Sequence, residues 1–386
     1  MKSTDMPNKE IYLDYAATSP VKAEILDSYF TDLNEIYANP ASGHEAGHQA
    51  MLAIDRARAI LSRVFHAKPH ELIFTSGGTE SLNLALQGLA GAYVRLPRKI
   101  VISAGEHEAV RAVSRAINYD VFEIGLDPDS GTVVRENLIG IVEKQQPGIV
   151  SLIYISNETG AINPVRELIS EIRGLSPRTK IHLDAVQAAG KVELDFSALD
   201  CDLMSISGHK LGSPKGIGIL IKRDKTLLKP LLYGGGQQSG LRSGTESAPL
   251  ALALARAAER ATSQLTDNAE RCLLLKNLFL ESLREITTEF RLLSPSTAVP
   301  QIIALSFPRL RGETLVNAAS VRGVYISHGS ACSGLHVGES PALRALGLSE
   351  DEILGTVRVS LNEDVAEDDI VAAARIIGSE YLRWRL

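Results

Sequence analysis

Short β-rich runs alternate with helical patterns between about residue 70 and residue 225 of this 386-residue chain. Several runs, such as 149–155, are almost continuously apolar, which is typical of strands buried on both faces of a parallel sheet. The alternation therefore predicts an α/β fold with a mostly parallel sheet flanked by helices. The expected strands lie at 71–75, 99–103, 120–124, 149–156, 180–184, 202–207 and 216–222.

The pattern changes after residue 248, where a long helical stretch at 250–283 is rich in Ala, Leu, Arg and Glu. Beyond it, three further runs are predicted to be strands, at 301–307, 324–327 and 357–361. We therefore expect two domains. The large one spans 19–258, and a smaller α+β domain is formed by 1–18 together with 259–386.

The bulk composition excludes several function classes. A net charge of −6, without any run of five basic residues, gives no electrostatic reason to bind nucleic acid or an anionic membrane. No apolar stretch approaches the ~18 residues that span a bilayer, and the first ten residues are polar, so we expect a cytoplasmic protein. Three widely spaced cysteines argue against a disulfide framework or a zinc site.

A lysine comes directly after the expected strand 202–207, in the segment Ser207-Gly208-His209-Lys210. Its amine is flanked by a hydroxyl and an imidazole, which is a suitable arrangement for a Schiff base with the aldehyde of pyridoxal phosphate. A surface lysine would have the same four-residue pattern. The polar residues at the ends of the other strands strengthen the first interpretation, because active sites form at the carboxyl ends of such sheets.

A glycine-containing turn at 75–81 joins an expected strand to a helix. Free backbone N–H groups at the helix start, together with the Thr79 hydroxyl, are suited to a phosphate, although a simple helix cap has the same pattern. A second glycine-rich loop, at 234–245, carries Arg242, Ser243 and Thr245. It is either a linker or a second anion-binding segment.

Three other strand ends carry polar side chains that suit a pyridine ring. His107 can stack on such a ring and exchange protons, and the amide of Asn157 can hold a ring hydroxyl oxygen. Asp184 can pair with the ring nitrogen and keep it protonated. Taken singly, His107 is also typical of a helix cap, Asn157 of a turn and Asp184 of another helix cap.

The C-terminal part supplies a thiol and a guanidinium. Cys332 lies in a Gly- and Ser-rich loop at 327–334, where a thiol can be presented to a substrate, whereas Cys201 and Cys272 lie in apolar or helical surroundings and are predicted to be structural. Arg358, on the expected strand 357–361, offers a fork for a carboxylate, although a surface ion pair is the common role.

The ordered set of these motifs resembles a known family. Together with 13–18, 39–42, 342–347 and 357–360, it is similar to the pyridoxal-phosphate cysteine desulfurases of the class V aminotransferase group, in the subgroup whose active loop reads Ser330-Ala331-Cys332. The resemblance covers nearly the whole chain. It implies the type I fold of pyridoxal-phosphate transferases, with a seven-stranded sheet in the large domain.

The resemblance also implies residue roles. Lys210 would carry the cofactor, Asp184 would pair with the pyridinium nitrogen, and His107 would stack on the ring. The ring oxygen and the phosphate group would be held by Gln187, Asn157, Gly78, Thr79, Ser207 and His209, with Gly208 in the same site. Arg358 and Asn39 would bind the substrate. Thr245 would complete the phosphate site of a partner subunit, which implies a homodimer.

The implied reaction converts L-cysteine to L-alanine, with Cys332 taking the sulfur as a persulfide for an acceptor protein. That acceptor would serve iron–sulfur cluster, thio-cofactor or transfer-RNA biosynthesis. The alternatives are a selenocysteine lyase, another class V lyase or aminotransferase, and a catalytically idle sulfur-relay protein that kept the fold.

The chain departs from the family pattern at a few positions. Ser156, Gln238-Ser239 and Gly334 replace the usual residues, which affects the expected conformation of the loops that carry them. The chain stops at Arg385-Leu386, without the extended tail with which housekeeping members bind their iron–sulfur scaffold. We therefore expect docking to such a scaffold to differ or to be absent.

Overall fold

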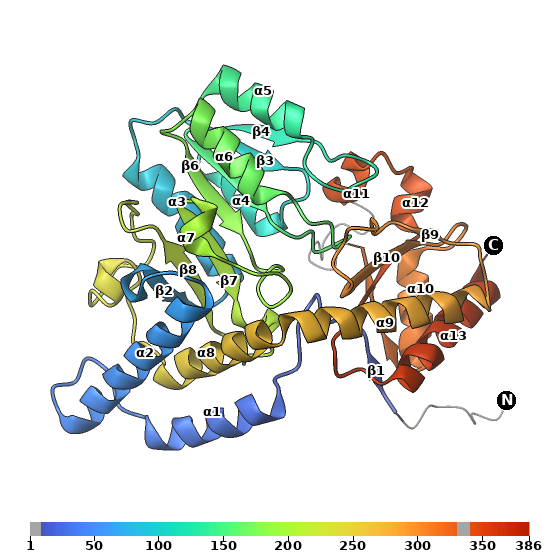
Figure 1. Ribbon diagram of the computed structural model, residues 1–386, viewed down its shortest axis with the longest axis horizontal. Helices are drawn as coiled ribbons and strands as arrows, with labels where there is room; N and C mark the ends of the chain where they lie inside the picture. Colours follow the sequence, from blue (N-terminus) through green and yellow to red (C-terminus); the bar gives the residue numbers. More distant parts are fainter. Residues whose placement is uncertain (1–8, 330–339, 386) are drawn as a thin grey trace.

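The computed structural model describes residues 9–329 and 340–385, which build one large and one small sheet (Figure 1). The large sheet has seven strands, and only β8 runs antiparallel to its neighbours. This confirms the predicted seven-stranded, mostly parallel sheet. Its strands, in spatial order, are β2 (Leu72–Thr75), β8 (Gly218–Lys222), β7 (Leu203–Ser207), β6 (Lys180–Asp184), β5 (Ile149–Ile153), β3 (Lys99–Ser103) and β4 (Asp120–Ile124).

Helices cover both faces of this sheet, because its strands are buried on both sides. On β3, Ile100 and Ile102 pack into the hydrophobic cluster of α3 and α4, whereas Val101 belongs to the cluster on the opposite face. The first face carries α3 (Gly78–Ala92) and α4 (Glu108–Ala116). The second carries α2 (Glu45–Val64), α5 (Arg135–Gln145), α6 (Val165–Leu175), α7 (Phe196–Leu199) and α8 (Ala248–Ser263).

Most predicted strand bounds hold closely, but the run expected as one strand at 324–327 forms two, β11 (Val324–Tyr325) and β12 (Ser327–His328), which belong to different sheets. The strands expected at 99–103, 120–124 and 180–184 have those bounds in the structure. The apolar run expected to extend to residue 156 leaves the sheet after Ile153, and Ile155 forms an isolated antiparallel bridge with Ile162 instead. The chain therefore turns away from the sheet edge before Asn157.

A four-stranded antiparallel sheet forms the core of the smaller part, which lies to the right in Figure 1. Its strands, in order, are β12 (Ser327–His328), β13 (Thr356–Ser360), β10 (Ile302–Ser306) and β9 (Arg291–Leu292). A separate hydrophobic cluster packs this sheet against α9, α10 and α13. The helices of this part are α9 (Leu265–Arg284), α10 (Gly312–Val321), α11 (Pro341–Ala345), α12 (Glu350–Leu354) and α13 (Glu367–Trp384).

The helical stretch expected at 250–283 consists of two helices. Gln264 has φ −114° and ψ 16°, outside the helical region, and separates α8 from α9. In Figure 1 the two helices lie nearly end to end and lead from the large sheet to the small one. The predicted boundary between residues 258 and 259 lies within α8, and the division into domains stays a prediction.

The N-terminal segment joins both parts. Strand β1 (Ile11–Tyr12) pairs in parallel with β11 (Val324–Tyr325), and Asp14 forms a bridge with Ser360. Helix α1 (Ala23–Glu35) then packs against α8. The remaining elements are the 3-10 turns η1 (Pro69–Glu71), η2 (Gly208–Lys210) and η3 (Gln238–Gly240). No helix within the described ranges is long and apolar enough to cross a membrane.

Candidate functional site

A pocket lies at the carboxyl ends of the parallel strands, where β6 ends at Asp184 and β7 ends at Ser207. The empty space inside it, including its open mouth, is about 830 Å³. Ten of the predicted site residues line it, although they come from strands, turns and helix starts far apart in sequence. They are Gly78, Thr79, His107, Asn157, Asp184, Gln187, Ser207, His209, Lys210 and Arg358.

Lys210 is held in place by the N-terminal segment. It ends the 3-10 turn η2, and its Nζ donates to the carbonyl oxygens of Ala16, at 2.5 Å, and Ala17, at 2.7 Å. The backbone around it is fixed as well, because Ser19 N donates to His209 O at 2.9 Å and Ser19 Oγ donates to Lys210 O at 3.2 Å. The amine is therefore directed into the pocket from a backbone secured on two elements.

Asp184 is a buried carboxyl group on the pocket wall, with 3% of its surface exposed. Its Oδ1 accepts a hydrogen bond from Val186 N at 2.9 Å. Burial raises the pKa of Asp184 to about 6, although the Val186 N–H and the Lys210 charge act to lower it. A cationic N–H group placed in the pocket would favour the ionised carboxylate. Asp184 therefore offers a buried carboxyl group that suits a cationic N–H group.

His107 is the N-cap of α4, and its Nδ1 accepts a hydrogen bond from Ala109 N at 3.1 Å. A neutral imidazole with an accepting Nδ1 carries its proton on Nε2. Burial lowers the pKa of His107, and the neighbouring Lys210 lowers it further. The pocket therefore faces a neutral ring whose orientation is set by the helix start.

The start of α3 and the Ser207 hydroxyl form a small polar cradle. A Cβ atom at Gly78 would lie 3.2 Å from Val186 Cγ2 and 3.3 Å from Ser207 Cβ, so this position is tight for any side chain. Ser207 is 1% exposed, and among the described residues its Oγ has no hydrogen-bond partner. An orphaned hydroxyl beside a helix N-terminus matches the needs of a phosphate group. The cradle therefore fits the phosphate of pyridoxal phosphate.

His209 completes this end of the pocket. Its Nδ1 lies 3.1 Å from Thr18 Oγ1. Burial lowers the pKa of His209 to about 4, with smaller contributions from Lys210 and Lys215. The ring is thus neutral at physiological pH and contributes a hydrogen-bonding group without a charge.

Arg358 reaches the pocket from the small sheet. Its guanidinium donates through Nη1 to Asn157 O and through Nη2 to Asp14 Oδ1, both at 2.8 Å. The residue is 2% exposed, and its Nε has no partner among the described residues. A buried cation held on two sides is a rigid partner for a carboxylate.

Three predicted residues are placed elsewhere, and a fourth is not described. Asn39 is exposed and caps its own turn, where its Oδ1 accepts from Ala41 N at 2.9 Å. Thr245 lines a different pocket, together with Gln238 and Arg242. Gly208 lies behind the pocket wall, where its N donates to Ile217 O at 3.0 Å. Cys332 lies outside the described residues, so its role stays a prediction.

The structure adds contributors that the sequence analysis did not assign. Two of them lie in the motif 13–18, whose residues had no predicted role. Asp14 pairs with Arg358, and the Ala16 carbonyl accepts from Lys210. Glu106, next to His107, is 5% exposed; burial raises its pKa well above the usual range, and the nearby Asp184 charge raises it further. Asp14 belongs to the motif 13–18, which contributes to the family resemblance, whereas no sequence signal distinguishes Glu106 from the neighbouring Glu108.

Comparisons with known proteins agree with this geometry. The model of the family described as "Aminotransferase class-V" matches residues 11–372. The chain is 32% identical over 371 residues to the cysteine desulfurase IscS of Methanosarcina thermophila, covering 96% of this chain and 91% of that protein.

Solved structures are similar over almost the full length as well. A NifS-like protein superposes with a TM-score of 0.90 at 31% identity, covering 96% of this chain and 99% of that chain. A structure of SspA in complex with cysteine has a TM-score of 0.78 at 30% identity, covering 92% of this chain and 99% of the other. Both the sequence and the fold therefore point to one family.

Proposed function

The chain belongs to the class-V aminotransferase family, and we propose that it is a cysteine desulfurase that converts L-cysteine to L-alanine and passes the sulfur on as a persulfide. The observation that carries this proposal is the convergence of Lys210, Asp184 and Arg358 on one pocket, in a chain similar to cysteine desulfurases over 96% of its length. The first two residues suit the cofactor, and the third suits the carboxylate of an amino acid.

The family uses pyridoxal phosphate, and the residues of the pocket fit it. When bound, this cofactor supplies an electron sink that makes bonds next to an amino-acid α-carbon easier to break. Lys210 would hold it covalently, Asp184 would pair with the ring nitrogen, and His107 would stack on the ring. Its oxygens would be held by Gln187, Asn157, Gly78, Thr79, Ser207 and His209.

Lys210 and Asp184 then have separate tasks. The Lys210 amine would act as the base that takes the proton from the substrate α-carbon, and as the acid that returns a proton to the carbon that loses sulfur. Asp184 would pair as a carboxylate with the cationic ring nitrogen and would thereby keep the proton on that nitrogen. Arg358 holds the substrate carboxylate and thereby orients the α-carbon toward Lys210.

Cys332 is proposed as the sulfur acceptor. Its thiolate attacks the sulfur of the substrate, a sulfur–sulfur bond forms, and the carbon–sulfur bond breaks. The electron pair left on carbon takes up a proton, so the organic product is alanine and the enzyme carries a persulfide. The persulfide then passes to a thiolate on an acceptor protein.

Absorption spectroscopy and product analysis test this proposal. The purified protein with pyridoxal phosphate should show a visible band that is lost in Lys210→Ala. With a thiol reductant present to release the persulfide sulfur as sulfide, Cys332→Ala should keep the band but lose sulfide release and alanine formation from cysteine. Cys272→Ala, at a buried thiol, should keep both activities. A wild-type protein without the band, or a fully active Cys332→Ala variant, contradicts the proposal. Selenide release without any sulfide release would identify a selenocysteine lyase instead.

We also propose that the protein acts as a homodimer in which Thr245 of one copy reaches the pocket of the other. In support, Thr245 is exposed and lines a separate pocket, and α1 exposes the apolar side chains Leu26, Phe30 and Leu33. Mixed dimers of Lys210→Ala and Thr245→Ala copies should regain activity, because one of their two sites is intact. The cytoplasmic location and the identity of the acceptor stay predictions.

A further inference from the structure

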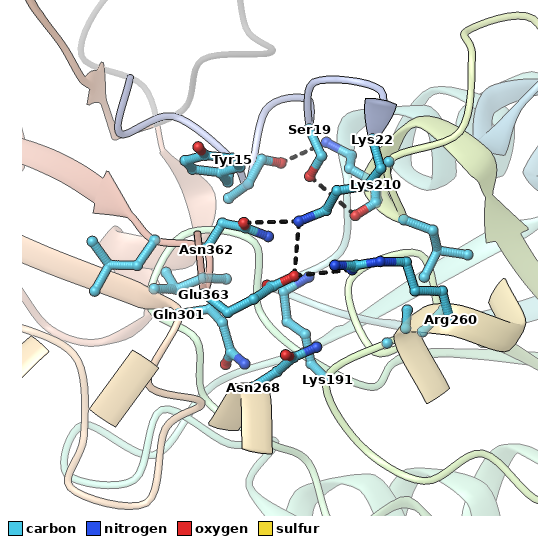
Figure 2. A pocket seen from close by; sticks show the side chains of 18 residues that line it. Tyr15, Ser19, Lys22, Lys191, Lys210, Arg260, Asn268, Gln301, Asn362 and Glu363 are labelled. Atoms are coloured by element: carbon cyan, nitrogen blue, oxygen red, sulfur yellow. Dashed lines mark hydrogen bonds and ion pairs between the residues drawn. The ribbon is translucent and has the colours of Figure 1, made fainter. Parts of the chain in front are cut away.

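A second pocket is lined by Lys191 and Lys210, among others (Figure 2). It shares Ala16 and Lys210 with the first pocket, so these two residues form a wall common to both. Inside it, Glu363 accepts from Lys22 at 2.8 Å and from Arg260 at 3.2 Å. Lys191 lines the same pocket but is bonded to Gln187, which lines the first one. The Lys191–Gln187 pair therefore connects the two pockets through their common wall.

The backbone between these two residues brings them together. The chain turns tightly from residue 185 to residue 191, and Gly190 adopts a φ of 74°, in the left-handed region that glycine tolerates best. A Cβ at Gly190 would also lie 2.8 Å from Leu211 Cδ2. The turn directs the Lys191 side chain back, so that its Nζ donates to Gln187 O at 3.0 Å and to Gln187 Oε1 at 3.2 Å.

The other end of the Gln187 amide is also bonded. Its Nε2 donates to Ala16 O at 2.8 Å, the same carbonyl oxygen that accepts from Lys210 Nζ. A lysine ammonium can only donate, and a carbonyl oxygen can only accept. Turning the amide over would place its N–H groups against the ammonium and its oxygen against the carbonyl. Only one orientation of the Gln187 amide is therefore compatible with both neighbours.

This orientation decides whether the Gln187 amide presents an N–H donor or an oxygen acceptor to the pocket. The Gln187 side chain is 4% exposed and lines the pocket, and its Nε2 carries two N–H groups, of which one is used by Ala16 O. No described residue accepts from the second N–H, which is therefore available to a ligand. A donor at this place would stabilise an ionised oxygen of a bound cofactor ring, whereas the amide oxygen would repel it.

Lys191 is cationic at neutral pH and so holds this arrangement. Burial lowers its pKa to about 8, with a further lowering from Lys210 and Arg358 and an opposing effect of Cys272. At pH 7 the ammonium still predominates, and a neutral amine would keep N–H donors for both Gln187 oxygens. The orientation therefore persists through the physiological range.

We propose that Lys191 is a positioning residue that fixes the Gln187 amide with an N–H directed at the cofactor. This inference rests on the proposed cofactor site, but it concerns how the site is tuned. The contact between Lys191 and the ligand is indirect, so removing Lys191 should act only while Gln187 is present.

A double-mutant cycle at fixed pH 7 tests it. The proteins are wild type, Lys191→Met, Gln187→Ala and the double variant, each loaded with pyridoxal phosphate. Two quantities are measured. The first is the ratio of the long- to the short-wavelength absorption band, which reports the protonation of the lysine-linked cofactor. The second is the dissociation constant of the cofactor. Lys191→Met should change each by roughly 3- to 10-fold, and by less than about 1.5-fold when Gln187 is already Ala.

The controls separate the possible failures. Lys276→Met removes another buried lysine, on α9 and outside both pockets, and should leave both quantities unchanged. Equal changes from Lys191→Met in both backgrounds would mean that Lys191 acts by its charge alone, which overturns the inference, as would no change in either. If Lys191→Met does not fold, Lys191→Gln replaces it in the same cycle. A wild-type protein without a visible band contradicts the proposed function itself.

Discussion

Arg358 and Asp14 form an ion pair at 2.8 Å although 344 residues separate them in the chain. The pair joins strand β13 of the small sheet to the N-terminal segment, and Asn157 O holds the other side of the guanidinium. Only 3% of the Arg358 side chain and 20% of the Asp14 side chain are exposed. The position of the proposed carboxylate-binding group thus depends on three distant segments.

Asp14→Asn should weaken substrate binding. Loss of the carboxylate charge leaves the Arg358 guanidinium free to move, so kcat/KM for L-cysteine should fall roughly 10- to 100-fold, chiefly through KM. Steady-state alanine formation, normalised to bound cofactor, measures this. Asp32→Asn breaks another partly buried pair, with Arg256, away from the pocket, and should change kcat/KM less than about twofold. Equal losses in both variants would argue against a positioning role.

Ser207→Ala should separate cofactor binding from stability. Because no described residue forms a hydrogen bond with the Ser207 hydroxyl, the free energy of unfolding of the apo-variant should lie within about 0.5 kcal/mol of the wild-type value. Affinity for pyridoxal phosphate should fall roughly 5- to 30-fold, since the phosphate loses a donor. Ser205→Ala is the matched control: its Oγ lies 3.0 Å from His182 Nε2 and 2.8 Å from Ser81 Oγ, so it should cost about 1–3 kcal/mol of stability. Unchanged cofactor affinity in Ser207→Ala would refute the phosphate assignment.

Asp184→Asn should stabilise the apo-protein while impairing the cofactor site. The folded-state pKa of Asp184, about 6, is above its value of 3.8 in the unfolded chain, so its contribution is favourable below pH 3.8 and is lost as pH rises through 6. At pH 7.5 the buried charge costs the apo-protein about 3 kcal/mol by linkage, and we expect Asn to recover about 1–3 kcal/mol in urea unfolding. Cofactor affinity should fall, because the ring nitrogen loses its anion.

Asp202 provides a control with the opposite sign. Burial acts to raise its pKa, but Arg173, Lys180 and the Ile181 N–H outweigh this and lower it. Lys180 Nζ lies 2.8 Å from Asp202 Oδ1. Asp202→Asn should therefore destabilise the protein at pH 7.5, by about 1–3 kcal/mol. If Asp184→Asn and Asp202→Asn both lowered the free energy of unfolding, the Asp184 charge would not destabilise the apo-protein, contrary to this prediction.

His182, two residues before Asp184 on β6, should cause acid destabilisation. It is fully buried, with Nδ1 2.9 Å from Ser151 Oγ, and burial lowers its pKa from 6.5 to about 3. Between pH 6.5 and pH 3 the unfolded chain therefore binds a proton that the folded chain does not. The free energy of unfolding decreases as the pH is lowered through this window. The loss should reach about 2 kcal/mol between pH 7.5 and pH 5.

Urea unfolding at several pH values isolates this contribution from the opposing one of Asp184. His182→Leu should be less stable at pH 7.5 but should lose about 2 kcal/mol less than wild type on going to pH 5. His48→Leu, at an exposed position, should keep the wild-type pH dependence. Parallel pH profiles for wild type and His182→Leu would contradict the prediction.

The sequence alone determined the large sheet and most of the residues at its edge. Apolar runs of strand length are a local signal, and the residues that come directly after parallel strands must meet at one edge of the sheet. Asp184, Ser207, His107 and Lys210 were predictable for that reason, and the structure places all four around one pocket.

Only the tertiary structure decided which other groups support that edge. Asp14, Ala16 and Lys191 act through contacts with Arg358, Lys210 and Gln187 that depend on how the N-terminal segment and the turn after β6 pack. The orientation of the Gln187 amide also needs two neighbours to be known at once. A local sequence pattern carries no information on such pairings, because they are set by the folded chain as a whole: the sequence determines which groups are available, and packing decides which of them meet.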